Sequence, residues 1–267
     1  MIKKVFKILL WIIIFVFLTS ITQIGGIVFI LSLLLNRIWR TKFVLKPMVT
    51  FFGLYIISTF LIVPFIAPLF GREKVKHTKF IKPANFMTVI LNRNYVKPEL
   101  NILLEETEIS LKGSQIKINY LDANFPFIDR FPLLPHLSHN DGRKIDFGLV
   151  YQRTDGKISQ EQKSISGYGI FEDPKNGETD QIRKCLNNGY FQYDYPKYFT
   201  FGSINEELEF SQNGTKKLIE SILKSQRLGK LFIEPHLTER LDLKDSRIRY
   251  QGCRSVRHDD HIHVQLN

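Results

Sequence analysis

The first 82 residues of the chain are almost free of acidic side chains. They contain twelve Lys or Arg residues and one acidic residue, Glu73, whereas residues 83–267 carry 25 basic and 25 acidic residues. The net charge of +11 is therefore confined to the N-terminal third of the chain. Because a domain that binds nucleic acid needs a basic surface of its own, the neutral C-terminal part argues against nucleic acid as a partner.

Charge of either sign is absent from residues 8–35 and from residues 47–70. Each stretch exceeds the roughly 18 apolar residues that suggest a membrane-spanning helix, so we expect residues 1–70 to anchor the chain in a lipid bilayer. Basic residues flank the first stretch, as is typical of the cytoplasmic side of a membrane. They are Lys3, Lys4 and Lys7 before it, and Arg37, Arg40, Lys42 and Lys46 after it.

Basic residues on both flanks favour a hairpin over a single crossing for residues 8–35, with its turn at Gln23-Ile24-Gly25-Gly26. A cleaved signal peptide is the alternative for this stretch. Residues 47–70 would then cross the membrane outward. The expected location is the inner or cytoplasmic membrane, with the C-terminal domain facing the periplasm or the cell exterior.

The rest of the chain shows no internal repeat and no low-complexity segment. We expect a basic, proline-containing stalk over residues 71–95 and one domain over residues 96–267. Its pattern predicts an α+β fold around a mainly antiparallel sheet. Helices are predicted over residues 100–108, 215–226 and 236–241, and strands over residues 115–121, 145–151, 231–233 and 261–266.

Cysteine is scarce, since Cys185 and Cys253 are the only two in the sequence. Their spacing does not resemble a zinc ribbon, which needs closely spaced Cys pairs. An oxidising compartment would permit a disulfide between them. Two unpaired buried thiols are the alternative, and the sequence leaves both open.

Histidine is also infrequent, yet five of the seven His residues fall into two short windows. In the second window, HDDHIHV, strand geometry places His261 and His263 on one face and Ile262 and Val264 on the other. The apolar pair can face a core while both imidazoles point toward a shared site. Such a pair on a rigid strand suits one metal ligand and one catalytic partner, and a pair of surface histidines is the alternative.

The first window, PHLSHNDGRKID, supplies His136, His139 and Asp146, with an Asn-Asp-Gly turn that lets the chain fold back. Two His and one carboxylate leave the fourth position of zinc open for water, which is typical of a catalytic site. The ion acidifies this water toward neutral pH and polarises the scissile carbonyl. Without the second window, His139 and Asp146 could equally form an isolated ion pair.

The spacing His-x6-Asp followed by a late His-x-His resembles the lysostaphin, D-Ala-D-Ala metallopeptidase and hedgehog group. With His136 and His258 included, it is most similar to the penicillin-insensitive murein endopeptidases, which hydrolyse peptide cross-links in peptidoglycan. The resemblance covers roughly residues 130–267 and lies in the order of the motifs. It implies zinc ligands at His139, Asp146 and His263 and catalytic histidines at His261 and His258.

The resemblance also suggests which bond is cut. Related carboxypeptidases have Glu three residues before the His-x-His, where this chain has His258, so the endopeptidase branch is favoured. Residues 147–235 contain no His that could match the family's further metal-binding His. One zinc ion is therefore expected, with His136 as a further candidate ligand. The alternatives are a D,D-carboxypeptidase and a catalytically silent zinc domain that binds cell-wall or protein partners.

Overall fold

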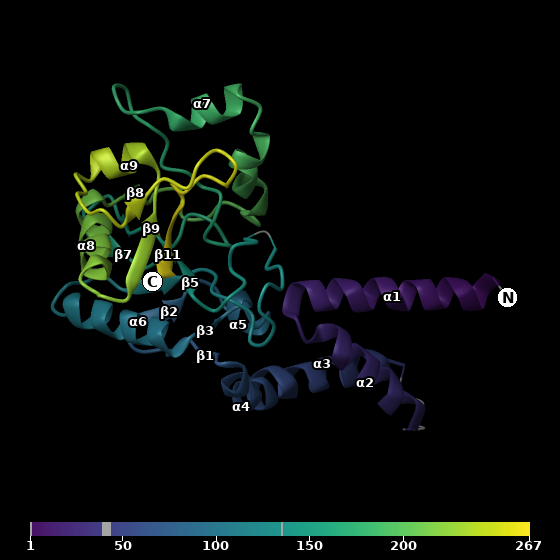
Figure 1. Cartoon of the computed structure of the whole chain (residues 1–267). Helices are drawn as coiled ribbons and strands as arrows, with labels where there is room; N and C mark the ends of the chain where they lie inside the picture. Colours follow the sequence, from purple (N-terminus) through teal and green to yellow (C-terminus); the bar gives the residue numbers. More distant parts are fainter. Residues whose placement is uncertain (1, 39–43, 135) are drawn as a thin grey trace.

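The N-terminal region is helical and is attached to a mixed α/β domain, as the computed structural model in Figure 1 shows. The structure describes residues 2–38, 44–134 and 136–267. Arg40 and Lys42, two of the flanking charges used to predict the topology, lie outside the described residues.

Two apolar helices, α1 (Ile2–Thr22) and α2 (Gly25–Ile38), open the chain and turn back on each other at Gln23 and Ile24. The turn falls where the sequence predicted a hairpin. Gly25 permits the close approach of the two helices, because a Cβ at this position would lie 2.7 Å from Oγ1 of Thr22. The same Oγ1 accepts the N–H of Gly25 at 2.8 Å and so caps the start of α2.

A second long apolar helix runs from Lys46 to Phe70. Pro64 has no N–H to donate, which accounts for the irregular turn that precedes it. Gly71 ends the helix with a φ of 69°, a left-handed conformation that glycine adopts readily. The segments of this helix are α3 (Lys46–Ile57), the π-helical turn η1 (Ser58–Ile62), α4 (Val63–Ile66) and the 3₁₀ turn η2 (Ala67–Phe70).

The helices α1 and Lys46–Phe70 are long and apolar enough to span a membrane, whereas α2 has 14 residues. Their apolar side chains face outward, since Ile13 is 64% exposed and Phe65 is 83% exposed. Contiguous exposed side chains of this kind are unfavourable in water and favourable in lipid. The two helices therefore favour association with a membrane.

The centre of the domain is a six-stranded sheet with strand order β10-β9-β11-β5-β4-β2. Its three central pairings are antiparallel, and the outermost pairing at each edge is parallel. The sheet is thus mixed, and the predicted antiparallel arrangement applies to its centre. The strands are β2 (Ile81–Pro83), β4 (Ile118–Tyr120), β5 (Lys144–Gly148), β9 (Leu228–Phe232), β10 (Ile248–Arg249) and β11 (His261–Leu266).

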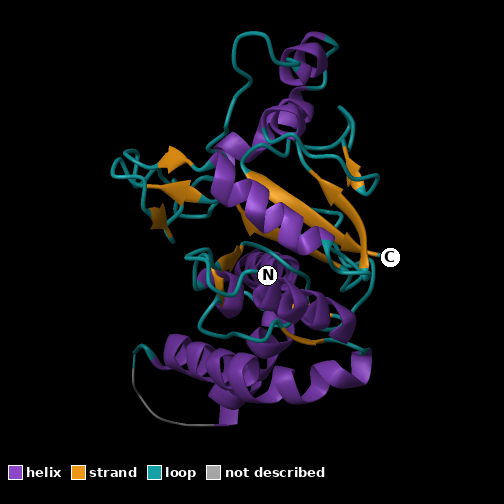
Figure 2. Ribbon diagram, turned by 90° about the vertical axis from the view of Figure 1, so that its left-hand side faces the viewer, coloured by secondary structure: helices purple, strands orange, loops and turns teal. Residues whose placement is uncertain are grey.

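Two helices, α6 (Pro98–Ser110) and α8 (Gln212–Leu223), pack on one face of this sheet (Figure 2). Ile262 and Val264 of β11 are fully buried in the core that the sheet and these helices share. Because side chains alternate along a strand, His261 and His263 lie on the opposite face of β11. The predicted division of this strand into an apolar face and a histidine face is confirmed.

Shorter elements surround the central sheet. The strand predicted over residues 145–151 ends at Gly148, because the chain then crosses to a small three-stranded sheet at Tyr151. The short strands are β1 (Glu73–Lys74), β3 (Tyr95–Val96), β6 (Tyr151–Gln152), β7 (Ile158–Ser159) and β8 (Glu209–Phe210). The short helices are α5 (Met87–Ile90), α7 (Gln181–Asn187), η3 (Phe191–Phe199) and α9 (Pro235–Arg240).

Residues 71–95 do not form the predicted stalk. Strand β2 pairs in parallel with β4 of the central sheet, and Val75 and Ile81 are buried in the main core. Strands β1 and β3 pair with each other within the same segment. The segment is therefore part of the domain, and the helix Lys46–Phe70 leads directly into the folded structure.

Cys185 and Cys253 form a disulfide that links α7 to the loop before β11. The sequence left open whether these two cysteines pair or remain free thiols, and the structure shows that they pair. Cys185 is fully buried next to Ile182 and Tyr193. The disulfide therefore ties a peripheral helix to the segment that leads into the histidine-bearing strand.

Candidate metal centre

The centre of the site is a pair of residues on neighbouring strands. Asp146 of β5 and His263 of β11 are directly opposite each other in the antiparallel register. Side chains at opposed positions point to the same face of a sheet. Nδ1 of His263 lies 2.8 Å from Oδ1 of Asp146, and both residues are buried. The strand pairing thus positions two of the three predicted ligands.

His139 reaches this pair from the loop between β4 and β5. Its Nε2 lies 3.1 Å from Oδ1 of Asp146 and 3.1 Å from Nδ1 of His263. Its other ring nitrogen, Nδ1, donates to the carbonyl oxygen of Ala123 at 2.7 Å. This hydrogen bond assigns the ring proton to Nδ1 and leaves a lone pair on Nε2. The three predicted ligand residues therefore converge on one point.

Few hydrogen-bond donors are available among the three converging atoms, which are Nε2 of His139, Oδ1 of Asp146 and Nδ1 of His263. When both imidazoles are neutral, only Nδ1 of His263 can carry a proton, and the remaining lone pairs face one another. A cation between the atoms would relieve this repulsion. A tetrahedral ion bound at about 2.0–2.1 Å separates its ligand atoms by about 3.3 Å, which is close to the 2.8–3.1 Å observed. The donor set therefore fits a metal ion.

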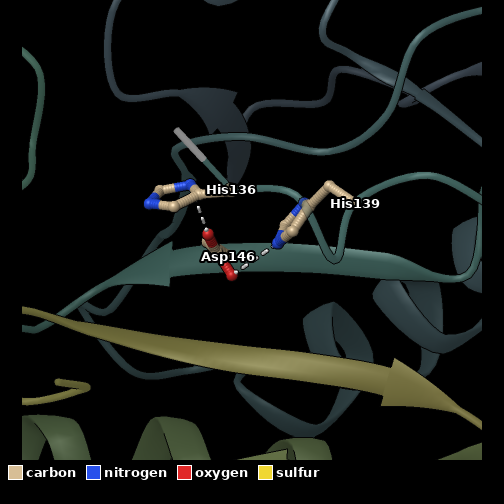
Figure 3. A group of neighbouring side chains, drawn as sticks. All are labelled: His136, His139 and Asp146. Atoms are coloured by element: carbon tan, nitrogen blue, oxygen red, sulfur yellow. Dashed lines mark hydrogen bonds and ion pairs between the residues drawn. The ribbon is translucent and has the colours of Figure 1, made fainter. Parts of the chain in front are cut away.

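His136 lies beside this group (Figure 3), with Nδ1 3.3 Å from Oδ2 of Asp146 and 3.5 Å from Oδ2 of Asp122. One potential ligand atom from each of His136, His139 and Asp146 lies within 4.8 Å of the others. These three buried residues could hold a metal ion, and they also form ion pairs with one another. His139 and Asp146 belong to this set and to the set completed by His263.

The protonation of the central pair follows from its surroundings. Burial would raise the pKa of Asp146, but His139, His261 and His263 hold that pKa well below its usual value. Burial lowers the pKa of His263 to about 4, although Asp146 opposes this change. An ionised carboxylate and a neutral imidazole are the forms that bind metals.

His261 lies next to the central pair on the same face of β11. Its Nδ1 contacts Oδ1 of Asp260 at 2.5 Å, and Oδ2 of Asp260 accepts the N–H of Gly169 at 2.6 Å. Nε2 of His261 is left facing the site, 3.8 Å from Oδ2 of Asp146. Burial lowers the pKa of His261, but the carboxylates of Asp260 and Asp146 outweigh it and raise the pKa to about 9.

His258 lies at the edge of the cluster, with its ring centre 4.8 Å from that of His261 and 5.8 Å from that of His263. Its backbone N–H donates to Oε1 of Glu234 at 2.9 Å. Burial, together with the positive charge of neighbouring imidazoles, holds the pKa of His258 well below its usual value. Its imidazole is therefore neutral.

Two residues of the cluster were not predicted. The hydroxyl of Tyr168 donates to Oδ2 of Asp146 at 2.8 Å, and the Tyr168 ring packs edge-on against His136. Asp122 faces His136 from the end of β4. Tyr168 stands between two glycines that both have positive φ, so the Gly-Tyr-Gly sequence was an available signal. Nothing in the sequence around Asp122 marks it.

The structure brings all the predicted site residues into one cluster and covers them. His136 is 6% exposed, and the other four histidines and Asp146 are each 4% exposed or less. The chain matches no model of a known protein family and no curated protein.

Proposed function

We propose that this protein is a membrane-bound zinc peptidase that hydrolyses peptide cross-links in peptidoglycan. The observation that supports this most directly is the convergence of His139, Asp146 and His263, whose ligand atoms lie 2.8–3.1 Å apart. Two His and one carboxylate form a frequent ligand set of catalytic zinc. His136 is a further candidate ligand beside them.

A bound zinc ion would supply an acidified water and polarise a substrate carbonyl. The side chains around it are held in place by their own hydrogen bonds: Ala123 fixes the ring of His139, and Asp260 fixes the ring of His261. Nε2 of His261 is thereby placed to donate a hydrogen bond to a developing oxyanion. His258 lies next to His261 and could assist it.

The choice of substrate rests on the motifs. The order of His136, His139 and Asp146 in one window and three histidines in the last resembles the penicillin-insensitive murein endopeptidases. His258 stands where related carboxypeptidases have Glu, which favours cleavage within a cross-link over release of a terminal residue.

An external position of the domain would give it access to peptidoglycan. Lys3, Lys4 and Lys7 at the start of α1 support a cytoplasmic N-terminus. The disulfide between Cys185 and Cys253 supports an oxidising compartment for the domain, because cytosolic thiols are kept reduced.

A catalytically silent zinc domain is the second candidate, and the burial of the site favours it. No candidate ligand or catalytic histidine is more than 6% exposed. Structural zinc sites are closed in this way, whereas catalytic sites keep a position open to water and substrate.

Digestion of purified peptidoglycan by the full-length protein in detergent tests the proposal. We expect new muropeptides from split cross-links, their loss with a chelator and their return with added zinc. His261→Ala should abolish the products and retain the zinc. His77→Ala is the matched control, because His77 contacts Tyr120 away from the cluster.

Two results would contradict the endopeptidase. Bound zinc without new muropeptides, unchanged by His261→Ala, would identify the silent domain, and release of free D-Ala would identify a D,D-carboxypeptidase. The position of the domain is tested separately with alkaline phosphatase or a fluorescent protein fused after Asn267. A cytoplasmic result would remove the cell-wall substrate and leave the zinc chemistry in place.

A further inference from the structure

The domain packs against the apolar helix Lys46–Phe70 well before that helix ends. The hydroxyl of Tyr55 donates to the carbonyl of Ile90, at the end of α5, at 2.7 Å. One turn further along, the ring of Phe60 stacks on Phe86 with ring centres 6.3 Å apart. Helix α5 therefore lies alongside the middle of this apolar helix.

A second contact joins the domain to the tip of the helical hairpin. Oε1 of Gln23 accepts the N–H of Phe127 at 2.9 Å, and the ring of Phe127 packs edge-on against Phe70 with ring centres 5.1 Å apart. The loop after β4, which goes on to carry His136 and His139, is thus seated on the ends of both membrane-spanning candidates. In Figure 1 this loop, drawn in teal, lies between the sheet and the end of α1.

Helix geometry gives the depth of these contacts. At about 1.5 Å per residue, Tyr55 and Phe60 lie about 14 and 21 Å along the helix from Lys46. By the same rise, Gln23 lies about 24 Å from Lys7. The hydrocarbon layer of a bilayer is about 30 Å thick. With Lys46 and Lys7 at one surface of this layer, the partner of Tyr55 falls near the midplane, and the partners of Phe60 and Gln23 fall inside its far half.

Most of the large side chains that project from these two segments are apolar and exposed, while Lys74 lies over the ring of Phe60 at 5.5 Å. Two charged residues belong to the loop after β4: Asp129 is ion-paired with Arg72, and Arg130 can reach lipid headgroups with its long side chain. Five large apolar residues are more than half exposed, and we call them the apolar surface of the domain: Phe86 (60%), Met87 (53%), Ile128 (55%), Leu134 (53%) and Leu137 (56%).

We propose that this apolar surface is inserted into the bilayer, in the leaflet nearest the domain. Its occupant is lipid because the surface continues the lipid-facing side of the helices: Phe86 stacks directly on Phe60, which is itself 38% exposed. The globular domain then binds the membrane through its own loops as well as through its anchor. Leu134 and Leu137 flank His136, so the loop of the metal centre lies at the lipid surface.

The test places a fluorescent label on single cysteines of the full-length protein in phosphatidylcholine–phosphatidylglycerol vesicles. Native Cys185 and Cys253 are joined in a disulfide, so Leu137→Cys can be labelled alone with bimane. Ile13→Cys on α1 reports lipid, and Ile109→Cys, 66% exposed near the end of α6, reports water. Quenching is measured with nitroxide-labelled lipids, and Leu134→Cys repeats the measurement at a second position.

We expect quenching at Leu137 to approach that at Ile13 and to exceed that at Ile109 several-fold. Quenching at Leu137 no greater than at Ile109, with Ile13 fully quenched, would overturn the lipid contact of the domain. An unquenched Ile13 would overturn the membrane anchor and the inference that rests on it. None of these quenching measurements depends on peptidase activity. Failure of the proposed reaction can therefore be distinguished from failure of the lipid contact.

Discussion

The guanidinium of Arg72 donates to the carbonyl of Asn140, the residue after His139, at 3.4 Å. Arg72 is the second residue after the apolar helix Lys46–Phe70, and it is 1% exposed. It also donates to the carbonyl of Phe125 and to Asp129. The Arg72 side chain therefore joins the end of the apolar helix to both ends of the loop that carries the candidate metal ligands His136 and His139.

Replacement of Arg72 by Gln is expected to disturb the metal centre from a distance. It leaves the carbonyl of Phe125 without the guanidinium donor, whereas the carbonyl of Asn140 keeps the N–H of Arg130 at 2.7 Å. The expected cost is about 1–3 kcal/mol of unfolding free energy. Thermal unfolding in detergent and zinc affinity measure the two effects, and both should fall. Lys79→Gln removes the same charge from an exposed position of the same segment and should change neither. Equal behaviour of the two variants would show that Arg72 does not position the loop.

Metal content per chain identifies the third ligand. Because His139 and Asp146 belong to both candidate sets, His139→Ala and Asp146→Asn should each abolish binding of zinc. His263→Ala should do the same, since its Nδ1 lies 3.1 Å from Nε2 of His139, while His136→Ala should retain one ion. Elemental analysis after dialysis gives the counts. Loss of zinc from His136→Ala with retention in His263→Ala would assign the third position to His136.

Glu234 is expected to make stability depend on pH. Burial and the neighbouring Asp259 raise its pKa from 4.5 to about 7, although Tyr193 and His258 donate hydrogen bonds to it. The folded protein thus binds the proton more tightly than the unfolded chain does. The resulting stabilisation is complete below pH 4.5 and is lost as the pH rises through 7, by at most about 3 kcal/mol.

The matched variants for this effect are Glu234→Gln and Glu206→Gln, the latter at an exposed position. Denaturant unfolding between pH 4.5 and 7.5 should show a flatter pH dependence for Glu234→Gln than for the wild type. Glu206→Gln should follow the wild type. Parallel curves for all three proteins would contradict the assignment of a protonated Glu234.

Removal of the disulfide is expected to destabilise the domain. Cys185 and Cys253 are 68 residues apart, and closing a loop of this length stabilises a fold by about 4 kcal/mol in the chain-entropy model. The double replacement by Ser should lower the melting temperature by roughly 10 °C. A reductant should produce the same shift in the wild type and none in the variant. A wild type that ignores the reductant would show that the bond is absent from the folded protein.

The parts of the structure with strong local signals could be predicted from the sequence. The alternation of His261, Ile262, His263 and Val264 gave the last strand with the bounds found, His261–Leu266. Helix α8 begins three residues before the predicted start at Thr215. Asn213 and Gly214 are poor helix formers, and the helix starts before them because Ser211 accepts the N–H of Gly214.

The parts that depend on distant partners could not be predicted. Strands β1, β2 and β3 have two or three residues each and no periodicity, and β2 exists through its pairing with β4, more than 30 residues later. For the same reason Asp122 could not be identified, since only the folded chain brings it to His136, whereas Tyr168 had a local signal in the Gly-Tyr-Gly sequence. The candidate metal ligands could be named from the sequence because the chemistry of such a site limits the residue types and their order.

The apolar helix leads directly into the sheet, and this limits the distance from the membrane at which the domain can act. A flexible stalk over the 25 residues from 71 to 95 would let a domain range over about 25–30 Å from the membrane. Here β2 is built into the central sheet and Arg72 is buried under the histidine loop, so no such movement is available. As a peptidase, the protein would cut only the layer of peptidoglycan that touches the membrane surface. Substrate would have to be delivered to it, and cleavage deeper in the wall would need a different enzyme.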